Sequence, residues 1–164
     1  MAIAAVVARA TGTPTTPAFW VGAIVASGIP DLDFILPLLG FSKRFHRGAS
    51  HSLLAIAILM VAGWLIARAV APHLPAGVLL AWCAALLSHP FLDVITTGPK
   101  LGARSWGIPL FWPLRSRRFW VTRPILGDRD EGTTVADQVR EMRDDLVRIV
   151  PVCGLVVLVA ILWK

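Results

Sequence analysis

The sequence predicts an all-α fold, a polytopic bundle of transmembrane helices, and three observations lead to this prediction. Of the 164 residues, 56% are hydrophobic and only 16% are charged, against about 25% charged in an average soluble domain. The mean hydropathy is +0.70. Two segments, 53–71 and 76–95, are apolar over about the 20 residues that a helix needs to cross a bilayer.

The two long apolar segments define the centre of the predicted bundle. Only "PHLP" separates them, which leaves room for a tight reversal and predicts antiparallel neighbours. Before them, residues 1–10 have the length of half a helix. Residues 18–29 predict a helix that ends at Pro30, because the residue before a proline disfavours the helical conformation.

The C-terminal part adds a further helix and a further span. Residues 134–149 have the apolar spacing of an amphipathic helix at the membrane interface, and 151–163 form a short apolar segment. We therefore expect about four membrane helices, allowing for a partial N-terminal one, in a single domain over residues 1–164.

The directions of these helices place most polar residues on one face of the membrane. Thirteen of the 16 Lys and Arg fall there, three in residues 31–50 and ten in residues 96–148. Basic loops mark the cytoplasmic side, so we expect a multi-pass inner-membrane protein with this face in the cytoplasm. The net charge of +6 then reflects topology and anionic head groups, and nucleic acid is disfavoured as a partner.

Asp31 and Asp33 in "PDLD" follow the first apolar helix. Pro followed by Asp is common turn chemistry, which is the simpler interpretation of either residue alone. Carboxylates beside hydrocarbon are costly unless they are paired or coordinated, and two within three residues is a dense placement.

His46, Arg47 and His51 in "HRGASHS" lie at the start of the next helix. Ser50 is a plausible N-cap for that helix. Each histidine could be an ordinary interfacial side chain. Arg47 could neutralise an anionic substrate or pair with one of the aspartates.

His89 and Asp93 in "SHPFLD" are the most informative pair. A spacing of four places both on one helix face, within reach of a single ion. Ionisable residues inside a membrane segment mark functional sites by default. The other interpretation is that they satisfy backbone groups freed by Pro90.

Three histidines and three aspartates thus converge at one end of the bundle, whereas His73 lies at the other end. Imidazole and carboxylate ligands without thiolate suit Zn²⁺, with Mn²⁺ as a rival. Six ligands are more than one tetrahedral ion takes, which favours a two-metal site over a single ion. Two ions would generate hydroxide and hold a phosphoester. The segment 106–121 interleaves aromatic residues with Arg115, Arg117 and Arg118, a composition typical of the head-group level.

At these motifs the chain resembles the YdjM-like family, described as LexA-regulated, membrane-bound metal-dependent hydrolases. The resemblance is carried by "PDLD", "HRGASHSL", "SHPFLDVITTGP" and "PLFWPLRSRRFW", which occur in order over about residues 20–125. The family is distantly similar to zinc-dependent phospholipase C. This resemblance implies metal binding by the following residues: Asp31, Asp33, His46, His51, His89 and Asp93. The family usually has a further N-terminal histidine, which residues 1–12 lack. Either the site forms without that ligand or the chain starts late.

The leading hypothesis is a hydrolase that cleaves a phosphoester of a lipid or of another phosphorylated substrate at the cytoplasmic interface. The catalytic residues expected are Asp31, Asp33 and Arg47. Arg47, Arg115, Arg117 and Arg118 are expected to bind the phosphate. Two other classes of function remain open. One is a metal or proton transporter that uses the same ligands, and the other is a non-catalytic membrane protein with a structural metal.

Overall fold

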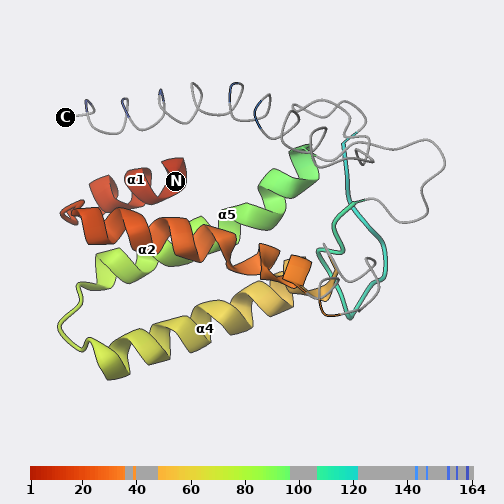
Figure 1. Ribbon diagram of the computed structural model, residues 1–164, viewed down its shortest axis with the longest axis horizontal. Helices are drawn as coiled ribbons and strands as arrows, with labels where there is room; N and C mark the ends of the chain where they lie inside the picture. Colours follow the sequence, from red (N-terminus) through yellow and green to blue (C-terminus); the bar gives the residue numbers. More distant parts are fainter. Residues whose placement is uncertain are drawn as a thin grey trace.

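The fold is seen in a computed structural model, which describes residues 1–35, 39, 48–96 and 107–121 (Figure 1). It also describes five single positions in the C-terminal part, which are helical: Arg143, Val147, Leu155, Leu158 and Leu162. The elements in chain order are α1 (Ala2–Ala10), α2 (Pro17–Gly28), η1 (Ile29–Phe34), η3 (Ala49–His51), α4 (Leu53–Val70) and α5 (Ala76–Thr96).

Across these ranges the fold is helical, as the composition predicts. The one pairing of extended backbone among the described residues is an isolated bridge between Ile108 and Phe119. Two helices, α4 and α5, are long and apolar enough to cross a membrane, and their bounds match the predicted segments closely. The short α1 agrees with the predicted half-helix. The interfacial helix over 134–149 and the span over 151–163 lie outside the described residues, apart from the single positions.

The predicted helix over 18–29 is confirmed by α2, which ends at Gly28, just before Pro30. The chain does not continue as a turn, however, because the 3-10 helix η1 follows directly and contains Pro30 in its first turn. A proline is tolerated in a first turn because its missing N–H would have no acceptor within the helix there. The chain therefore changes from α to 3-10 geometry at Ile29, and Asp31 and Asp33 lie on a helix rather than in a turn.

The α5 helix is at the centre of the packing and contacts α1, α2 and α4. Its core with α1 and α2 consists mainly of alanines: Ala4, Ala8, Ala23, Ala81 and Ala85, with Phe19 and Val78. Small residues allow close approach of helix backbones inside a membrane. One close approach of α2 and α5 is at Gly22, where an added Cβ would collide with the Trp82 ring. The Trp82 indole N–H also donates to the Phe19 carbonyl, at 2.9 Å.

The α4 helix presents a long apolar surface to its surroundings. Its single buried residue is Ile56. Side chains along its whole length are exposed: Leu54, Ile58, Val61, Leu65, Ile66 and Val70. An apolar surface this continuous is unfavourable in water and suits contact with lipid chains.

The two ends of the helical bundle differ in what they contain. α4 and α5 are joined by residues 71–75, and this turn contains the exposed His73 (Figure 1). η1, η3 and the C-terminal end of α5 meet at the other end. His73 is therefore far from the predicted site, as helix direction suggests.

Candidate metal centre

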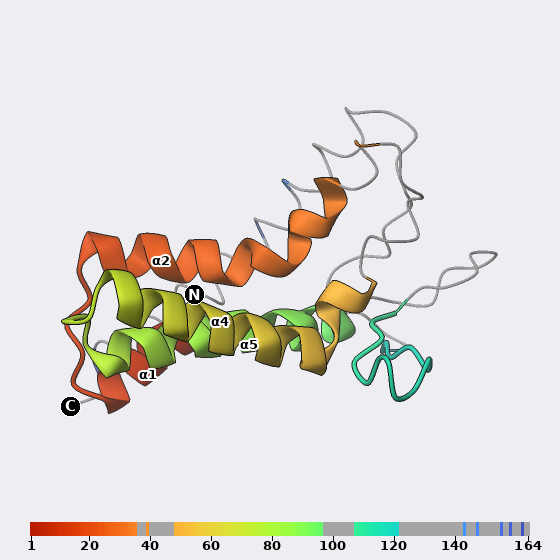
Figure 2. The ribbon, with the colours of Figure 1, turned by 90° about the horizontal axis from the view of Figure 1, so that it is seen from below.

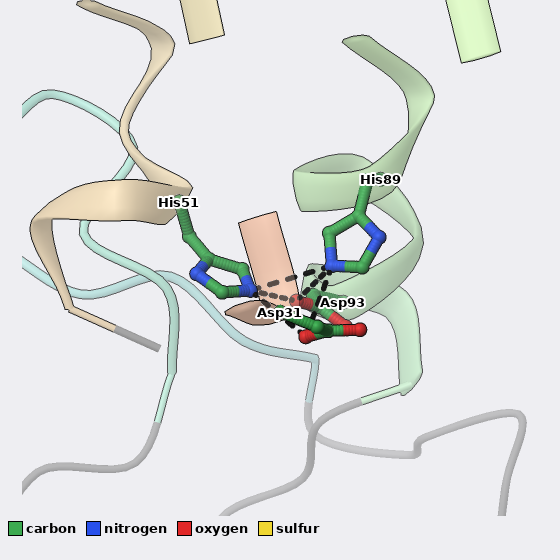
Figure 3. A group of neighbouring side chains, drawn as sticks. All are labelled: Asp31, His51, His89 and Asp93. Carbon is green, nitrogen blue, oxygen red and sulfur yellow. Dashed lines mark hydrogen bonds and ion pairs between the residues drawn. The ribbon is translucent and has the colours of Figure 1, made fainter. Parts of the chain in front are cut away.

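Three elements bring four predicted ligands together at this end. Asp31 comes from η1, His51 from η3, and His89 and Asp93 from the last turns of α5 (Figure 3). One ligand atom from each lies within 4.8 Å of every other, which is close enough to bind a metal ion. Within the described part of the chain, this is the one group of His, Cys, Asp and Glu side chains that lie close enough together to hold a metal ion.

The local structure at His51 follows from the contacts of Ser52. Ser52, rather than the predicted Ser50, is the N-cap of α4, and its Oγ accepts from the Ala55 N–H at 3.2 Å. The Ser52 hydroxyl also donates to the Ala49 carbonyl at 2.7 Å, which closes the short η3 turn. Because of this turn, the His51 side chain is completely buried and is directed toward α5.

The four atoms form a regular cluster. His51 Nε2 lies 3.4 Å from Asp31 Oδ1 and 3.1 Å from Asp93 Oδ2. His89 Nε2 lies 3.4 Å from each of the same two carboxylate oxygens. The two Nε2 atoms are 3.3 Å apart. Five of the six separations within the cluster are therefore nearly equal.

These separations fit a metal-ligand shell. Zn–N and Zn–O bonds are about 2.0–2.2 Å, so the corners of a tetrahedron around Zn²⁺ are about 3.3–3.6 Å apart. The observed values of 3.1 to 3.4 Å fall at or just below this range. Two imidazoles and two carboxylates without thiolate also suit a borderline divalent ion. The residues present therefore fit the metal that the motifs imply.

Asp33 has a different place from the one predicted. Its carboxylate Oδ2 lies 3.4 Å from His51 Nδ1, on the side of the ring that faces away from the cluster. Ser50 Oγ donates to the same oxygen and lies 3.0 Å from His51 Nδ1. The Asp33 side chain is only 6% exposed. An imidazole that binds metal through one nitrogen commonly donates from the other to a carboxylate, which holds the ring in place.

The charges of the cluster reinforce one another. Burial alone would lower the pKa of the His51 imidazole, but hydrogen bonds with the three surrounding carboxylates, Asp31 first, raise the pKa to about 10. Burial would raise the pKa of the Asp31 carboxyl, but hydrogen bonds with His51 and His89 hold it well below its usual range. The carboxylates around the imidazoles are therefore ionised, and their negative charge favours a bound cation at this place.

The other predicted site residues are outside the cluster or outside the part of the chain that the structure describes. His46 and Arg47 lie outside the described residues. Arg115, Arg117 and Arg118 belong to the segment 107–121, where Arg118 donates to the Gly107 carbonyl at 2.8 Å and Arg117 lies over the Phe119 ring. The contacts of Ser50 with Asp33 and with His51 Nδ1 were not predicted from the sequence, because the position of Ser50 beside a helix start suggested an N-cap.

Fold and site together define a class, an all-helical protein with two helices able to cross a membrane and a His/Asp cluster at one end that can hold a metal ion. The chain belongs to the YdjM inner membrane protein family, whose model matches residues 1–164, the whole chain. This confirms the resemblance carried by the motifs. No curated protein and no solved structure matches the chain significantly.

Proposed function

We propose that this protein is a metal-dependent hydrolase that cleaves a phosphoester of a lipid or lipid-linked substrate at the cytoplasmic interface of the inner membrane. The observation that carries the proposal is the close cluster of Asp31, His51, His89 and Asp93 at the end of two candidate membrane spans. Zn²⁺ suits the ligand separations best, and Mn²⁺ is the rival ion.

The cluster is open on one side. The Asp31 side chain is 47% exposed, whereas the side chains of His51, Asp93 and His89 are 0%, 13% and 14% exposed. A substrate would therefore approach the ion past Asp31, the most exposed of the four ligands. A divalent ion held here would polarise a phosphoryl oxygen and acidify water. Asp33, buried against His51, orients that ring instead of contacting substrate.

The membrane topology is part of the proposal. α2 and η1 form one helical path of 18 residues, Pro17–Phe34. With rises of about 1.5 Å and 2.0 Å per residue, this path is about 30 Å long, which matches the hydrocarbon core. It supports a third crossing beside α4 and α5. The excess of Lys and Arg in the sequence of the loops assigned to this face supports a site on the cytoplasmic side.

The test combines metal analysis with hydrolysis. The purified protein is expected to contain zinc and to release phosphate or a phosphorylated head group from phospholipids or from phosphodiester probes. His89→Ala combined with Asp93→Ala should lose both the metal and the activity, and His73→Ala, at the other end, should retain both. Full metal content and activity in the double variant would overturn the site.

The second candidate function is that of a non-catalytic membrane protein with a structural metal, and the number of ligands favours it. Four protein ligands complete a tetrahedral shell, which is typical of structural zinc, whereas catalytic zinc keeps one position for water. Co²⁺ substitution distinguishes the two. A visible spectrum that changes when phosphate is added supports catalysis, and a four-coordinate spectrum that phosphate leaves unchanged supports a structural metal. Transport is less well supported because the ligands lie at one end of the helices.

A further inference from the structure

Residues 107–121 are attached to the point where α4 begins. Leu53 is the first residue of α4, and its N–H donates to the Leu110 carbonyl at 2.9 Å. Gly107 to Leu110 are buried, and Ile108 is completely so. Figure 2 shows this segment beside the start of α4. Because α4 is a candidate span from Leu53 onward, Leu110 lies at the level where that helix enters the membrane.

The base of this segment is closed by several contacts. Ile108 and Phe119 exchange two backbone hydrogen bonds of 2.9 Å. Gly107 has φ +98°, and an added Cβ would lie 2.8 Å from the Phe119 carbonyl oxygen, so glycine is required there. The Arg118 guanidinium donates to the Gly107 carbonyl at 2.8 Å. The tip that follows is therefore held in a defined position.

The tip, residues 111–117, is exposed throughout and is rich in apolar side chains. Phe111 is 44% exposed, Trp112 46% and Leu114 89%. Arg115 and Arg117 follow directly, and residues 107–121 contain three arginines and no acidic residue. Aromatic and arginine side chains placed together are typical of the membrane interface, where rings enter the head-group layer and guanidinium groups bind phosphates.

We propose that the tip inserts into the head-group layer of the membrane that α4 enters, with Leu114 deepest and with Arg115 and Arg117 on lipid phosphates. A lipid surface is the occupant we infer, because the tip is attached at the start of a candidate span and its charge complements anionic head groups. This inference goes beyond the proposed function and does not depend on metal or catalysis.

Spin labels test the depth of the tip. In the full-length protein with Cys83→Ala and Cys153→Ala, Leu114→Cys is labelled and the protein is reconstituted into phosphatidylcholine vesicles with or without phosphatidylglycerol. Collision with oxygen, which concentrates in lipid, is compared with collision with a water-soluble nickel complex. Ser116→Cys is the matched control, because Ser116 is also exposed but lies between the two arginines.

The label at 114 is expected to collide with oxygen more than with nickel, and the label at 116 less so. Phosphatidylglycerol should increase this difference, and Arg115→Gln combined with Arg117→Gln should remove that increase. Equal nickel access at 114 and 116 in both vesicles would show that the tip faces water. Protection of 114 from both reagents would show that protein covers the tip. Either result would overturn the inference, and neither depends on hydrolysis.

Discussion

Metal binding should depend strongly on pH, because His51 must lose a proton before it can coordinate an ion. Contacts with carboxylates raise the pKa of His51 to about 10, so its imidazole is protonated at neutral pH in the metal-free protein. For one proton released, affinity rises about tenfold per pH unit below the pKa. Between pH 7 and pH 9 the loss of the His51 proton alone should therefore lower the Kd for Zn²⁺ about 100-fold, or about 2.7 kcal/mol, and His89, which must also be neutral to bind, can only add to this change. An ordinary imidazole, with a pKa of about 6.5, would give a change of only about 1.3-fold.

The assay is a competition titration against a chelator of known affinity at each pH, combined with calorimetry in two buffers that differ in ionisation enthalpy. Asp33→Asn is the matched variant. It removes one of the carboxylates that raise the pKa of His51, so its affinity curve should reach its plateau at lower pH. A Kd that changes less than about twofold between pH 7 and pH 9 would mean that His51 is neutral in the metal-free protein, and would refute the reasoning.

Three further predictions concern the same ring, the core and the stability of the metal-free protein. After correction for the proton on His51, Asp33→Asn should bind Zn²⁺ about 10- to 100-fold more weakly, since Asp33 orients the ring without joining the cluster. A loss of metal as complete as that in His89→Ala would make Asp33 a direct ligand. Gly22→Ala should destabilise the fold by about 1–3 kcal/mol in a denaturant titration, because the new Cβ meets the Trp82 ring. Gly63→Ala, where an added Cβ meets nothing within 4 Å, should be neutral or stabilising by up to about 1 kcal/mol, and equal losses in the two variants would contradict the packing. The raised pKa of His51 stabilises the metal-free protein below about pH 6.5, and this contribution is lost as the pH rises toward 10, so unfolding should become easier over that interval. Unchanged stability across it would contradict the contacts of His51.

The course of the chain around the cluster was predictable from local patterns. Apolar length predicts α4 and α5, since about 20 predominantly apolar residues are what a helix needs to cross a bilayer. Once the helices alternate in direction, the end of α2, the start of α4 and the end of α5 must lie on one face. Asp31, His51, His89 and Asp93 could therefore be grouped without a structure. The four-residue spacing of His89 and Asp93 places both on one side of α5.

The different positions of Asp31 and Asp33 could not be predicted in this way. With Pro30 read as a helix end, both aspartates were expected in a turn, where either could bind metal. In the 3-10 helix each residue rotates by about 120°, so residues two apart point in different directions. Asp31 consequently meets the Nε2 atoms of the cluster, and Asp33 meets the Nδ1 atom of His51.

The sequence by itself determined the helical class, the two long apolar helices, the family and the identity of four clustered residues, because these follow from composition, apolar length and motif order. Only the tertiary structure decided which atoms meet: the close spacing of the four ligand atoms, the placement of Asp33 and Ser50 behind His51, and the attachment of residues 107–121 to Leu53. These contacts join residues distant in sequence. Their distances depend on how closely alanine and glycine let α2 and α5 approach, which no local pattern records.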